Sequence, residues 1–261
     1  MKQLVTTGLQ GIPSLQPNDD LAKLLCDAVH AADLRWQADD VVVVAQKAIS
    51  KVENRYVDLK TVEPSASARE LAETVQKDPR LVELVLRESH AVVRAVPGVL
   101  IVRHHSGHVM ANAGIDASNL PTFQKQDGED WVLLLPKDAD ASAAKLSAEL
   151  SQRAQQSIAV VISDSFGRPW RQGVTNVAIG VSGMAALYDK RDEQDRYGRS
   201  LQVTQVGVAD LIASSAGLVM GEGSEGVPAA HIRGLRNDYL QAERHTNAQA
   251  LLRPSSEDLF R

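Results

Sequence analysis

The sequence lacks several features that would assign its class at once. Cys26 is the single cysteine in 261 residues, so no disulfide can form within the chain. No run approaches the roughly 20 apolar residues that a membrane-spanning helix needs. The formal net charge is −5, and no dense block of lysine and arginine is interleaved with aromatic residues. These absences argue against a secreted disulfide scaffold, a membrane protein and a nucleic-acid-binding protein.

The beginning of the chain lacks the pattern of a signal peptide. The stretch "MKQLVTTGLQGIPSLQ" is broken by glycine and proline before a long apolar segment forms. One unpaired cysteine also fits a reducing compartment. We therefore expect a cytoplasmic protein.

Common motifs for phosphate and zinc are missing as well. The sequence has no G-x-x-x-x-G-K-[ST], no H-E-x-x-H and no cysteine pair. "GEGSEG", at residues 221–226, matches G-x-G-x-x-G in its letters. That motif requires a strand before it and a helix after it, whereas here an expected helix precedes it and Pro228 follows. A dinucleotide-binding fold is therefore not predicted.

The pattern of apolar residues predicts a mixture of helices and strands. Helices are expected over residues 18–36, 67–76, 78–89, 138–155 and 208–220. Strands are expected over residues 40–46, 90–96, 98–105, 131–136 and 157–165. The elements do not alternate strictly, and residues 90–105 read as an antiparallel hairpin around a Pro-Gly turn. We therefore predict an α+β fold with two subdomains and mixed sheets.

The stretch "GHVMANAGIDASNL", residues 107–120, carries small residues and side-chain oxygens after a strand-like segment. The oxygens of Asp116 and Asn119 suit a hard cation, and the nearby glycine would let the backbone approach a ligand. The alternative is an Asx-turn in which these side chains bind only neighbouring backbone N–H groups. His104, His105 and His108 lie beside this stretch, and we interpret them as incidental rather than as a set of ligands.

A second candidate is "VVISDSFGRPWRQGVTN", residues 160–176. Asp164 is expected at the carboxyl end of a buried strand, a common position for a metal-binding or basic carboxylate. Ser165 follows it, and Arg168 and Arg171 could each bind a phosphate or carboxylate with two hydrogen bonds. The alternative is a helix cap at Asp164 or Ser165 with a surface pair between Trp170 and an arginine.

Two further segments could bind anions. The loop "VMGEGSEGVPAAHIRG", residues 219–234, could wrap a nucleotide if a cation offset Glu222 and Glu225, or it could be a bare surface loop. "GIPSLQP" at 11–17 offers rigid backbone groups, and Lys47 and Lys51 in "AQKAISKVENR" lie four residues apart, on one face of a helix. A solvated helix face is the alternative for the two lysines.

Taken in order, these blocks resemble one family closely. The blocks "GIPSLQPNDDLAKLL", "VVVVAQKAISKVENR", "KDPRLVELVLRES", "ANAGIDASN", "ISDSFGRPWRQGVTNVAIGVSG" and "LVMGEGSEGVPAAHIRG" are similar to those of the coenzyme F-420:L-glutamate ligases. The resemblance covers roughly residues 8–236. It implies a homodimer with a two-subdomain α+β fold that uses GTP and Mg²⁺ or Mn²⁺, with K⁺ as a further cation. Such an enzyme joins L-glutamate to the deazaflavin precursor F-420-0, can add further γ-linked glutamates, and is expected to act through an acyl phosphate.

The resemblance also implies roles for individual residues. A first metal would be bound by Asp116 and Asp164, and a second would be approached by Ser165 and Glu222. The residues expected to contact the nucleotide are Gly11, Ile12, Pro13, Ser14, Gln46, Lys51, Asn119, Met220, Gly221, Glu222, Gly223, Gly226, Val227 and Pro228. The residues expected to carry catalysis are Asp116, Asp164, Lys51 and Arg168.

On this basis we expect residues 1–90 and 190–245 to form a nucleotide-binding subdomain. Residues 91–189 would form an inserted metal and substrate subdomain, and residues 246–261 a peripheral tail. The sequence departs from the family pattern at Ser165, where threonine is expected, and at Val174, where glutamine is expected. The loop at 220–228 is also one residue longer. These departures leave open a ligase for another carboxylate acceptor, a decayed nucleotide or deazaflavin binder, and a metal phosphatase.

Overall fold

The computed structural model describes residues 3–118, 130–241 and 244–258, so the predicted nucleotide contact Asn119 lies outside the described residues. The chain forms two compact units. Unit 1 comprises Met1–Pro13, Asp20–Gln46 and Asp138–Arg261, and unit 2 comprises Ser14–Asp19 and Lys47–Lys137. Unit 2 is therefore almost entirely an insertion between two segments of unit 1.

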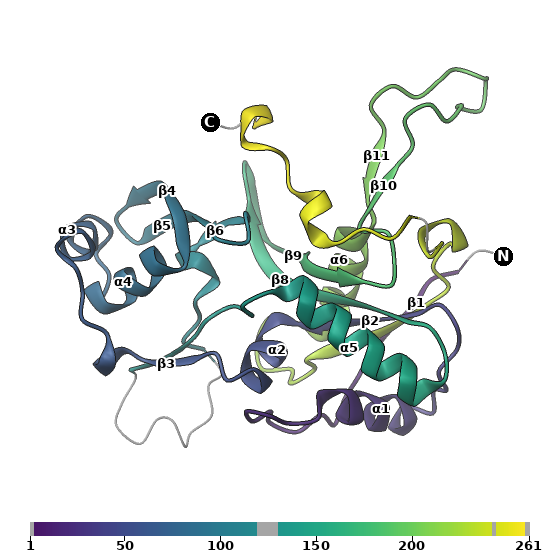
Figure 1. The fold of residues 1–261 in the computed structure, drawn as a ribbon, viewed down its shortest axis with the longest axis horizontal. Helices are drawn as coiled ribbons and strands as arrows, with labels where there is room; N and C mark the ends of the chain where they lie inside the picture. Colours follow the sequence, from purple (N-terminus) through teal and green to yellow (C-terminus); the bar gives the residue numbers. More distant parts are fainter. Residues whose placement is uncertain (1–2, 119–129, 242–243, 259–261) are drawn as a thin grey trace. The chain divides into compact units, whose positions relative to one another are not determined.

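Unit 1 is built on a mixed five-stranded sheet with the strand order β1-β12-β2-β8-β9 (Figure 1). Only the β2–β8 pair is parallel, and its neighbours are antiparallel. The strands are β1 (Val5–Gly8), β2 (Asp40–Ala45), β8 (Ile158–Arg168), β9 (Arg171–Ser182) and β12 (Ala229–Arg233). Val41 to Val44 of β2 are fully buried, as the continuous β-branched run of a central strand predicts.

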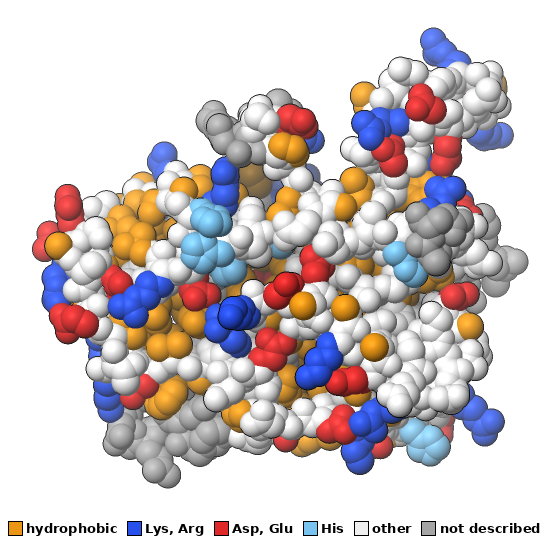
Figure 2. Space-filling view, viewed as in Figure 1, with side chains coloured by type: hydrophobic (Ala, Val, Ile, Leu, Met, Phe, Trp, Pro, Cys, Tyr) orange, Lys and Arg blue, Asp and Glu red, His pale blue; other side chains and the backbone are white. Residues whose placement is uncertain are grey.

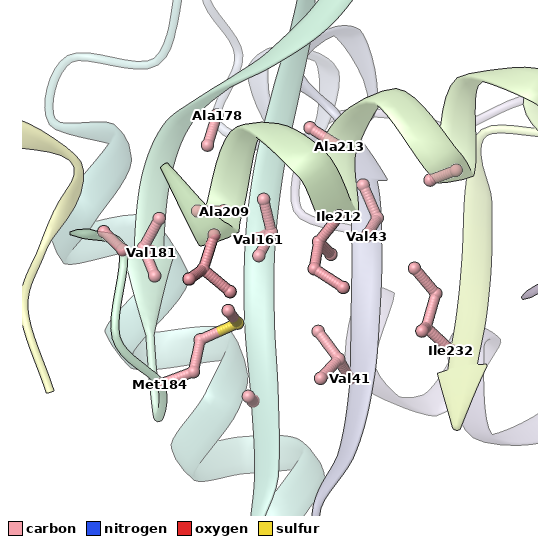
Figure 3. Close-up of a cluster of buried hydrophobic side chains, with 14 of the residues drawn as sticks. Val41, Val43, Val161, Ala178, Val181, Met184, Ala209, Ile212, Ala213 and Ile232 are labelled. Atoms are coloured by element: carbon pink, nitrogen blue, oxygen red, sulfur yellow. The ribbon is translucent and has the colours of Figure 1, made fainter. Parts of the chain in front are cut away.

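Helices cover this sheet. On one face lies α6 (Val208–Met220), whose Ala209, Ile212 and Ala213 point at side chains from β2, β8 and β12 (Figure 3). α5 (Ala139–Ala154) packs on β8 and β9, and α1 (Leu21–Ala31) packs on α5. Because successive strand residues point to opposite faces, every second β2 valine meets α6 and the others face the opposite side.

Unit 2 consists of short elements around two small sheets. α3 (Ala66–Val75) and α4 (Pro79–Arg87) pack with the antiparallel sheet β4-β5-β6, through a core that includes Val82, Leu100 and Val102. The strands of that sheet are β4 (Ser89–Val96), β5 (Val99–His104) and β6 (Val109–Ala111). A second sheet pairs β3 (Tyr56–Asp58) with β7 (Trp131–Leu133). The described part of unit 2 also contains α2 (Gln46–Val52), which begins in unit 1, η1 (Leu59–Thr61) and η2 (Asn112–Gly114).

The rest of unit 1 extends from the central sheet. β10 (Leu187–Asp189) and β11 (Gln205–Gly207) pair as the base of a projecting hairpin (Figure 1). The described residues after β12 include the short helical turns η4 (Asn237–Tyr239), η6 (Ala248–Leu251) and η7 (Ser255–Glu257). Across the described ranges, every helix is too short or too polar to span a bilayer.

The α+β class and the mixed sheets predicted from the sequence are confirmed. The boundaries between the units fall near residues 47 and 137 rather than at 91 and 189. The reason is pairing: β8 and β9 join the sheet of β2, so residues 158–182 belong to unit 1. Part of the expected tail also packs against unit 1, because Ala248 is fully buried and its N–H donates to the Asp140 carboxylate at 2.9 Å.

The start of α5 is held tightly against β9. Asp140 also accepts a hydrogen bond from the backbone N–H of Val181 at 2.8 Å. A Cβ at Gly180 would lie 2.2 Å from the carbonyl oxygen of Ala139, so only glycine allows this approach of helix to strand. This contact fixes β9, which carries part of the site described below.

A buried charged group lies at the start of β2. Asp40 is 1% exposed and accepts hydrogen bonds from Nε and Nη2 of Arg233 at 2.8 and 2.7 Å and from the N–H of Gln37 at 2.9 Å. Nε2 of buried His231 is 2.9 Å from the same carboxylate, at ion-pair distance but outside hydrogen-bond geometry. Burial alone would raise the pKa of Asp40, but Arg233 and His231 together lower it to about 2.

This low pKa predicts a loss of stability in acid. Above the ordinary pKa of 3.8 the ionised Asp40 favours the folded state by about 2 kcal/mol, and this is lost as the pH falls through about 2. The difference in free energy of unfolding between wild type and Asp40→Asn, measured by urea titration, should shrink by about 2 kcal/mol between pH 6 and pH 2. A constant difference would show that Asp40 titrates alike in both states.

Candidate functional site

One edge of the unit 1 sheet gathers the ends of several strands. Ala45, the last residue of β2, is paired with Ser163 of the parallel strand β8. Gly8, the last residue of β1, is paired with Ala230 near the start of β12. The carboxyl ends of β1 and β2 and the residues that follow Ser163 therefore meet at this edge. In mixed and parallel sheets, this is where ligands commonly bind.

Three segments predicted to contact a nucleotide adjoin this edge. Residues 11–13 follow β1, and Leu9 N–H donates to the carbonyl of Ala229 at 2.8 Å. Gln46 directly follows β2 and is 3% exposed. The N–H of Ala45 donates to the carbonyl of Pro228 at 2.9 Å, which anchors the end of the 220–228 loop beside β2. Thus the fold brings together segments that are far apart in the sequence.

The 220–228 loop has an internal support. The carboxylate of Glu225 accepts a hydrogen bond from the N–H of Gly223 at 2.7 Å. Gly221 has a φ of +75°, and a Cβ there would lie 2.3 Å from the Glu225 carboxyl carbon. Both glutamates are exposed, but Glu225 bonds within the loop, whereas Glu222 bonds to Asn176 of β9.

Asp164 and Ser165 lie within a strand, not at its carboxyl end. The prediction of a strand ending at residue 165 was wrong, because β8 continues to Arg168 and forms a long hairpin with β9. Ser165 is paired with Asn176, and Asp164 with Val177. Side chains alternate between the faces of a strand, so Ser165 and Asn176 share one face and Asp164 points to the other.

Asn176 connects this hairpin with the 220–228 loop. Its Nδ2 donates to Oε1 of Glu222 at 2.5 Å, and its backbone carbonyl accepts from the Ser214 hydroxyl at 2.8 Å. A Cβ at Gly217 of α6 would lie 2.5 Å from that Nδ2, so the small residue makes room for the side chain. Glu222 is therefore bound to Asn176, which shares a face of the hairpin with Ser165. Sequence reasoning quoted Asn176 within its motif but gave it no role.

α6 also holds β9 through Asp210. Its carboxylate accepts a hydrogen bond from the N–H of Ala178 at 2.9 Å. Burial raises the pKa of Asp210, and the hydrogen bond from Ala178 only partly offsets this effect. Asp210, Ser214 and Gly217 lie at helical spacing on one face of α6. This face therefore fixes the position of residues 176–178.

Two buried polar atoms on β8 lack hydrogen bonds among the residues that the structure describes. They are the hydroxyl of Ser163 and Nε of Arg168. Unsatisfied buried polar atoms are rare, and they often mark a missing ion, water or ligand. Arg168 also donates from Nη2 to the carbonyl of Gln172 at 3.2 Å, within the same hairpin, and Arg171 begins β9. Along β8, Ser163 directly precedes Asp164 and Arg168 follows it by four residues.

Unit 2 carries a separate charged cluster. Nζ of Lys47 lies 2.6 Å from Oδ2 of Asp116 and donates to the Ser118 hydroxyl at 2.8 Å. Asp116 also accepts from the N–H of Ser118 at 2.5 Å, which is the Asx-turn that was left open as an alternative. Burial raises the pKa of Asp116, but the bonds from Lys47 and Ser118 outweigh it and lower the pKa. The Asp116 carboxylate is thus ionised and paired with the ammonium group of Lys47.

Lys51 lies one helical turn after Lys47 in α2. Burial and the neighbouring charge of Lys47 lower the pKa of Lys51, and Asp116 raises it. Burial disfavours a lysine charge, so the charged Lys51 lowers the stability of the fold, as residues of functional sites often do. Ser14, predicted to contact the nucleotide, also belongs to unit 2.

The predicted metal ligands are divided between the units. Asp164, Ser165 and Glu222 belong to unit 1, and Asp116 belongs to unit 2. Within the ranges that the structure describes, no three histidine, cysteine, aspartate or glutamate side chains form a group suited to a metal. The donors themselves are carboxylate and hydroxyl oxygens, which fit Mg²⁺ or Mn²⁺. Their role as metal ligands stays a prediction.

Comparison with known proteins shows the family of the chain. The profile of a family described as F420-0:Gamma-glutamyl ligase matches residues 11–234. A coenzyme F420:L-glutamate ligase of Methanopyrus kandleri is 40% identical over 264 residues, covering 100% of both chains. Relatives of the same name are 39% identical in Methanothermobacter thermautotrophicus, covering 97% of each chain, and 41% identical in Archaeoglobus fulgidus, covering 87% of this chain and 86% of the relative. The chain belongs to the F420-0:gamma-glutamyl ligase family.

Proposed function

We propose that the protein joins L-glutamate to the deazaflavin precursor F-420-0, with GTP as the energy source, and can add further γ-linked glutamates. Family membership and the names of the relatives support the ligase reaction. The structural observation that carries the proposal is the unit 1 sheet edge. There the segments after β1 and β2 and the loop before β12 adjoin a hairpin that carries Asp164, Ser165 and Arg168.

The chemistry requires activation of a carboxylate, because its oxygen is a poor leaving group. Transfer of the γ-phosphoryl group of GTP to the acceptor carboxylate gives an acyl phosphate and GDP. The amine of glutamate then attacks the acyl carbon, the C–O bond to phosphate breaks, and an amide, inorganic phosphate and a proton are released. The triphosphate, the acceptor and glutamate are all anionic, so cations must offset their repulsion.

The oxygen donors are suited to this demand. Divalent ions, when bound, would offset the charge of the phosphates during transfer. Glu222 binds Asn176, and Asn176 shares a face of the hairpin with Ser165. Asp164 points to the other face of β8. This separation supports the assignment of Ser165 and Glu222 to one ion and Asp164 to another. The unsatisfied Ser163 hydroxyl and Arg168 Nε each leave room on β8 for a further polar partner.

The basic residues would bind the anionic groups. Lys51 has a partly desolvated ammonium, which strengthens its interaction with phosphate oxygens. Arg168 is suited to a carboxylate or phosphate, because its guanidinium offers paired donors. The loop from Met220 to Pro228 would wrap the nucleotide, with Gly221, Gly223 and Gly226 allowing close backbone approach. We further propose a cytoplasmic homodimer that uses K⁺ as an additional ion.

The reaction itself provides the test. The enzyme is incubated with F-420-0, L-glutamate, GTP and Mg²⁺ or Mn²⁺, and the products are analysed by mass spectrometry. We expect an acceptor heavier by one glutamyl unit, an amide at the α-amino group of glutamate, and stoichiometric GDP and phosphate. Consumption of GTP without a glutamylated product, across several deazaflavin acceptors, would reject the ligase in favour of a metal phosphatase.

A ligase of the same fold with a different carboxylate acceptor is the second candidate. Val174 motivates it, since it stands where the family pattern has glutamine and is 49% exposed. It lies two residues before Asn176 and therefore on the same face of β9. Glutamate-dependent GDP release with another acid but not with F-420-0 would favour this candidate. GTP binding without any turnover would indicate a decayed binder.

A further inference from the structure

Two exposed histidines of unit 2 come from neighbouring strands and face each other. His90 belongs to β4, and His105 directly follows β5. Their Nδ1 atoms are 3.3 Å apart, and their rings are nearly perpendicular, at 82°. Figure 2 shows a group of neighbouring histidine side chains, with single histidines elsewhere on the same face. The pair adjoins an irregular step in the β4–β5 ladder, between Ser89 and Ala91.

The hydrogen bond from His105 to a backbone carbonyl determines which of its ring nitrogens carries the proton. Its Nε2 lies 2.8 Å from the backbone carbonyl of Arg87, and a carbonyl only accepts, so Nε2 carries the proton. In the neutral ring, Nδ1 then has a free lone pair directed at His90. A second nitrogen held by a backbone carbonyl is the usual arrangement of a metal-binding histidine.

The distance between the two Nδ1 atoms matches chelation. With metal–nitrogen bonds of about 2.05 Å, nitrogens 3.3 Å apart subtend an angle of about 107° at a shared ion, close to the tetrahedral angle. We propose that His90 and His105 form a binding site for a borderline divalent transition-metal ion, with Zn²⁺ as the best geometric match. In the metal-free pair, His90 donates from Nδ1; on binding, its proton shifts to Nε2, and no proton is released.

The neighbouring histidines use their Nδ1 atoms elsewhere. Nδ1 of buried His104 binds both the N–H and the hydroxyl of Ser106, at 2.9 and 2.8 Å. The same hydroxyl lies 2.9 Å from Nδ1 of His108, which is also buried. These two residues shape the turn after β5. Among the residues that the structure describes, the site therefore offers two protein ligands, and its other positions could take water or an external ligand.

This site differs in chemistry from the proposed catalytic one. Imidazole nitrogen favours Zn²⁺, Ni²⁺ and Cu²⁺, whereas the carboxylate and hydroxyl oxygens of the ligase site favour Mg²⁺ and Mn²⁺. The inference does not depend on the ligase reaction. A bound ion would also link β4 to β5 beyond their backbone hydrogen bonds.

Zinc titration of the full chain by calorimetry tests the proposal, with saturating Mg²⁺ present to occupy hard-cation sites. Wild type should bind one Zn²⁺ that His90→Asn and His105→Asn each weaken roughly 100-fold, because each loses the chelating partner. His245→Asn is the matched control, since His245 is exposed and lies 3.1 Å from a backbone carbonyl but pairs with no histidine in the described residues. It should bind zinc as wild type does.

Histidine ¹⁵N spectra give an independent readout. Zn²⁺ should shift the Nδ1 signals of both residues, while Nε2 of His105 stays protonated and Nε2 of His90 becomes protonated. Zinc should also raise the Tm of wild type and of His245→Asn, but not that of the two pair variants. Unchanged zinc affinity in His90→Asn and His105→Asn, or binding through Nε2, would overturn the site. Neither result would bear on ligase activity.

Discussion

Asp164→Asn should lower ligase turnover roughly 10³-fold at saturating Mg²⁺ or Mn²⁺, because a lost metal carboxylate removes several kcal/mol of transition-state stabilisation. The amide keeps the size of the side chain and its acceptor for the N–H of Ser165. The fold should therefore be retained, with an unchanged Tm and circular dichroism spectrum. Asp116→Asn should have a loss of the same order, since it would supply the other ligand of the same ion.

Asp189→Asn is the control for this prediction. Asp189 ends β10 in unit 1 and forms an exposed ion pair with Arg191, which contributes little to stability. The turnover of the Asp189→Asn variant should stay within about twofold of wild type, because an exposed substitution of this kind changes the stability by only about 0.5 kcal/mol or less. If Asp164→Asn kept near wild-type turnover while folded, that carboxylate could not be a metal ligand.

Lys51→Met should lower turnover about 10- to 150-fold, which corresponds to the loss of one charge-assisted phosphate contact worth about 1.5–3 kcal/mol. Its free energy of unfolding should stay the same or rise. The sign follows from the lowered pKa of Lys51, since the folded environment disfavours its charge through burial and Lys47. Steady-state kinetics and urea unfolding on the same preparation would show both effects.

Lys51→Arg and Lys23→Met separate the possible causes. Arginine keeps the charge, so Lys51→Arg should recover part of the turnover. Lys23 lies on the exposed surface of α1, paired with Asp27 at 2.6 Å, and its replacement should leave kinetics unchanged. If Lys51→Met instead unfolds at much lower urea and this accounts for its lost activity, Lys51 has a structural role.

Much of the fold could be predicted from the sequence, because helices and strands leave local patterns of apolar residues. The run from Val41 to Val44 predicted a buried strand, and it is the central strand β2. The long hairpin of β8 and β9 was harder to predict, because its outer half contains exposed, polar and glycine residues. Those residues are strands only because each half pairs with the other. The positions of the domain boundaries depend on the same long-range pairing.

The sequence predicted which residue types form the site, but not which of these side chains contact one another. Asp116 and Lys47 were both named from the sequence, yet their ion pair joins segments about 70 residues apart. Asn176 gave no signal of its own, since its link to Glu222 depends on the register of β9 and on the space at Gly217. His105 was interpreted as incidental because its partner His90 lies on another strand. Sequence spacing alone does not reveal contacts of this kind.

The strand order of the unit 1 sheet has a consequence for how the chain is made. β2 lies between β8 and β12, yet it precedes both in the sequence, and its partners begin at Ile158 and Ala229. At ribosomal rates of about 5–20 residues per second, β2 waits roughly 10 to 40 seconds for its last partner. During that time a strand of four consecutive valines has open edges. The nascent protein is therefore most exposed to aggregation before residue 229 is synthesised, and chaperone binding to β2 would matter most in that interval.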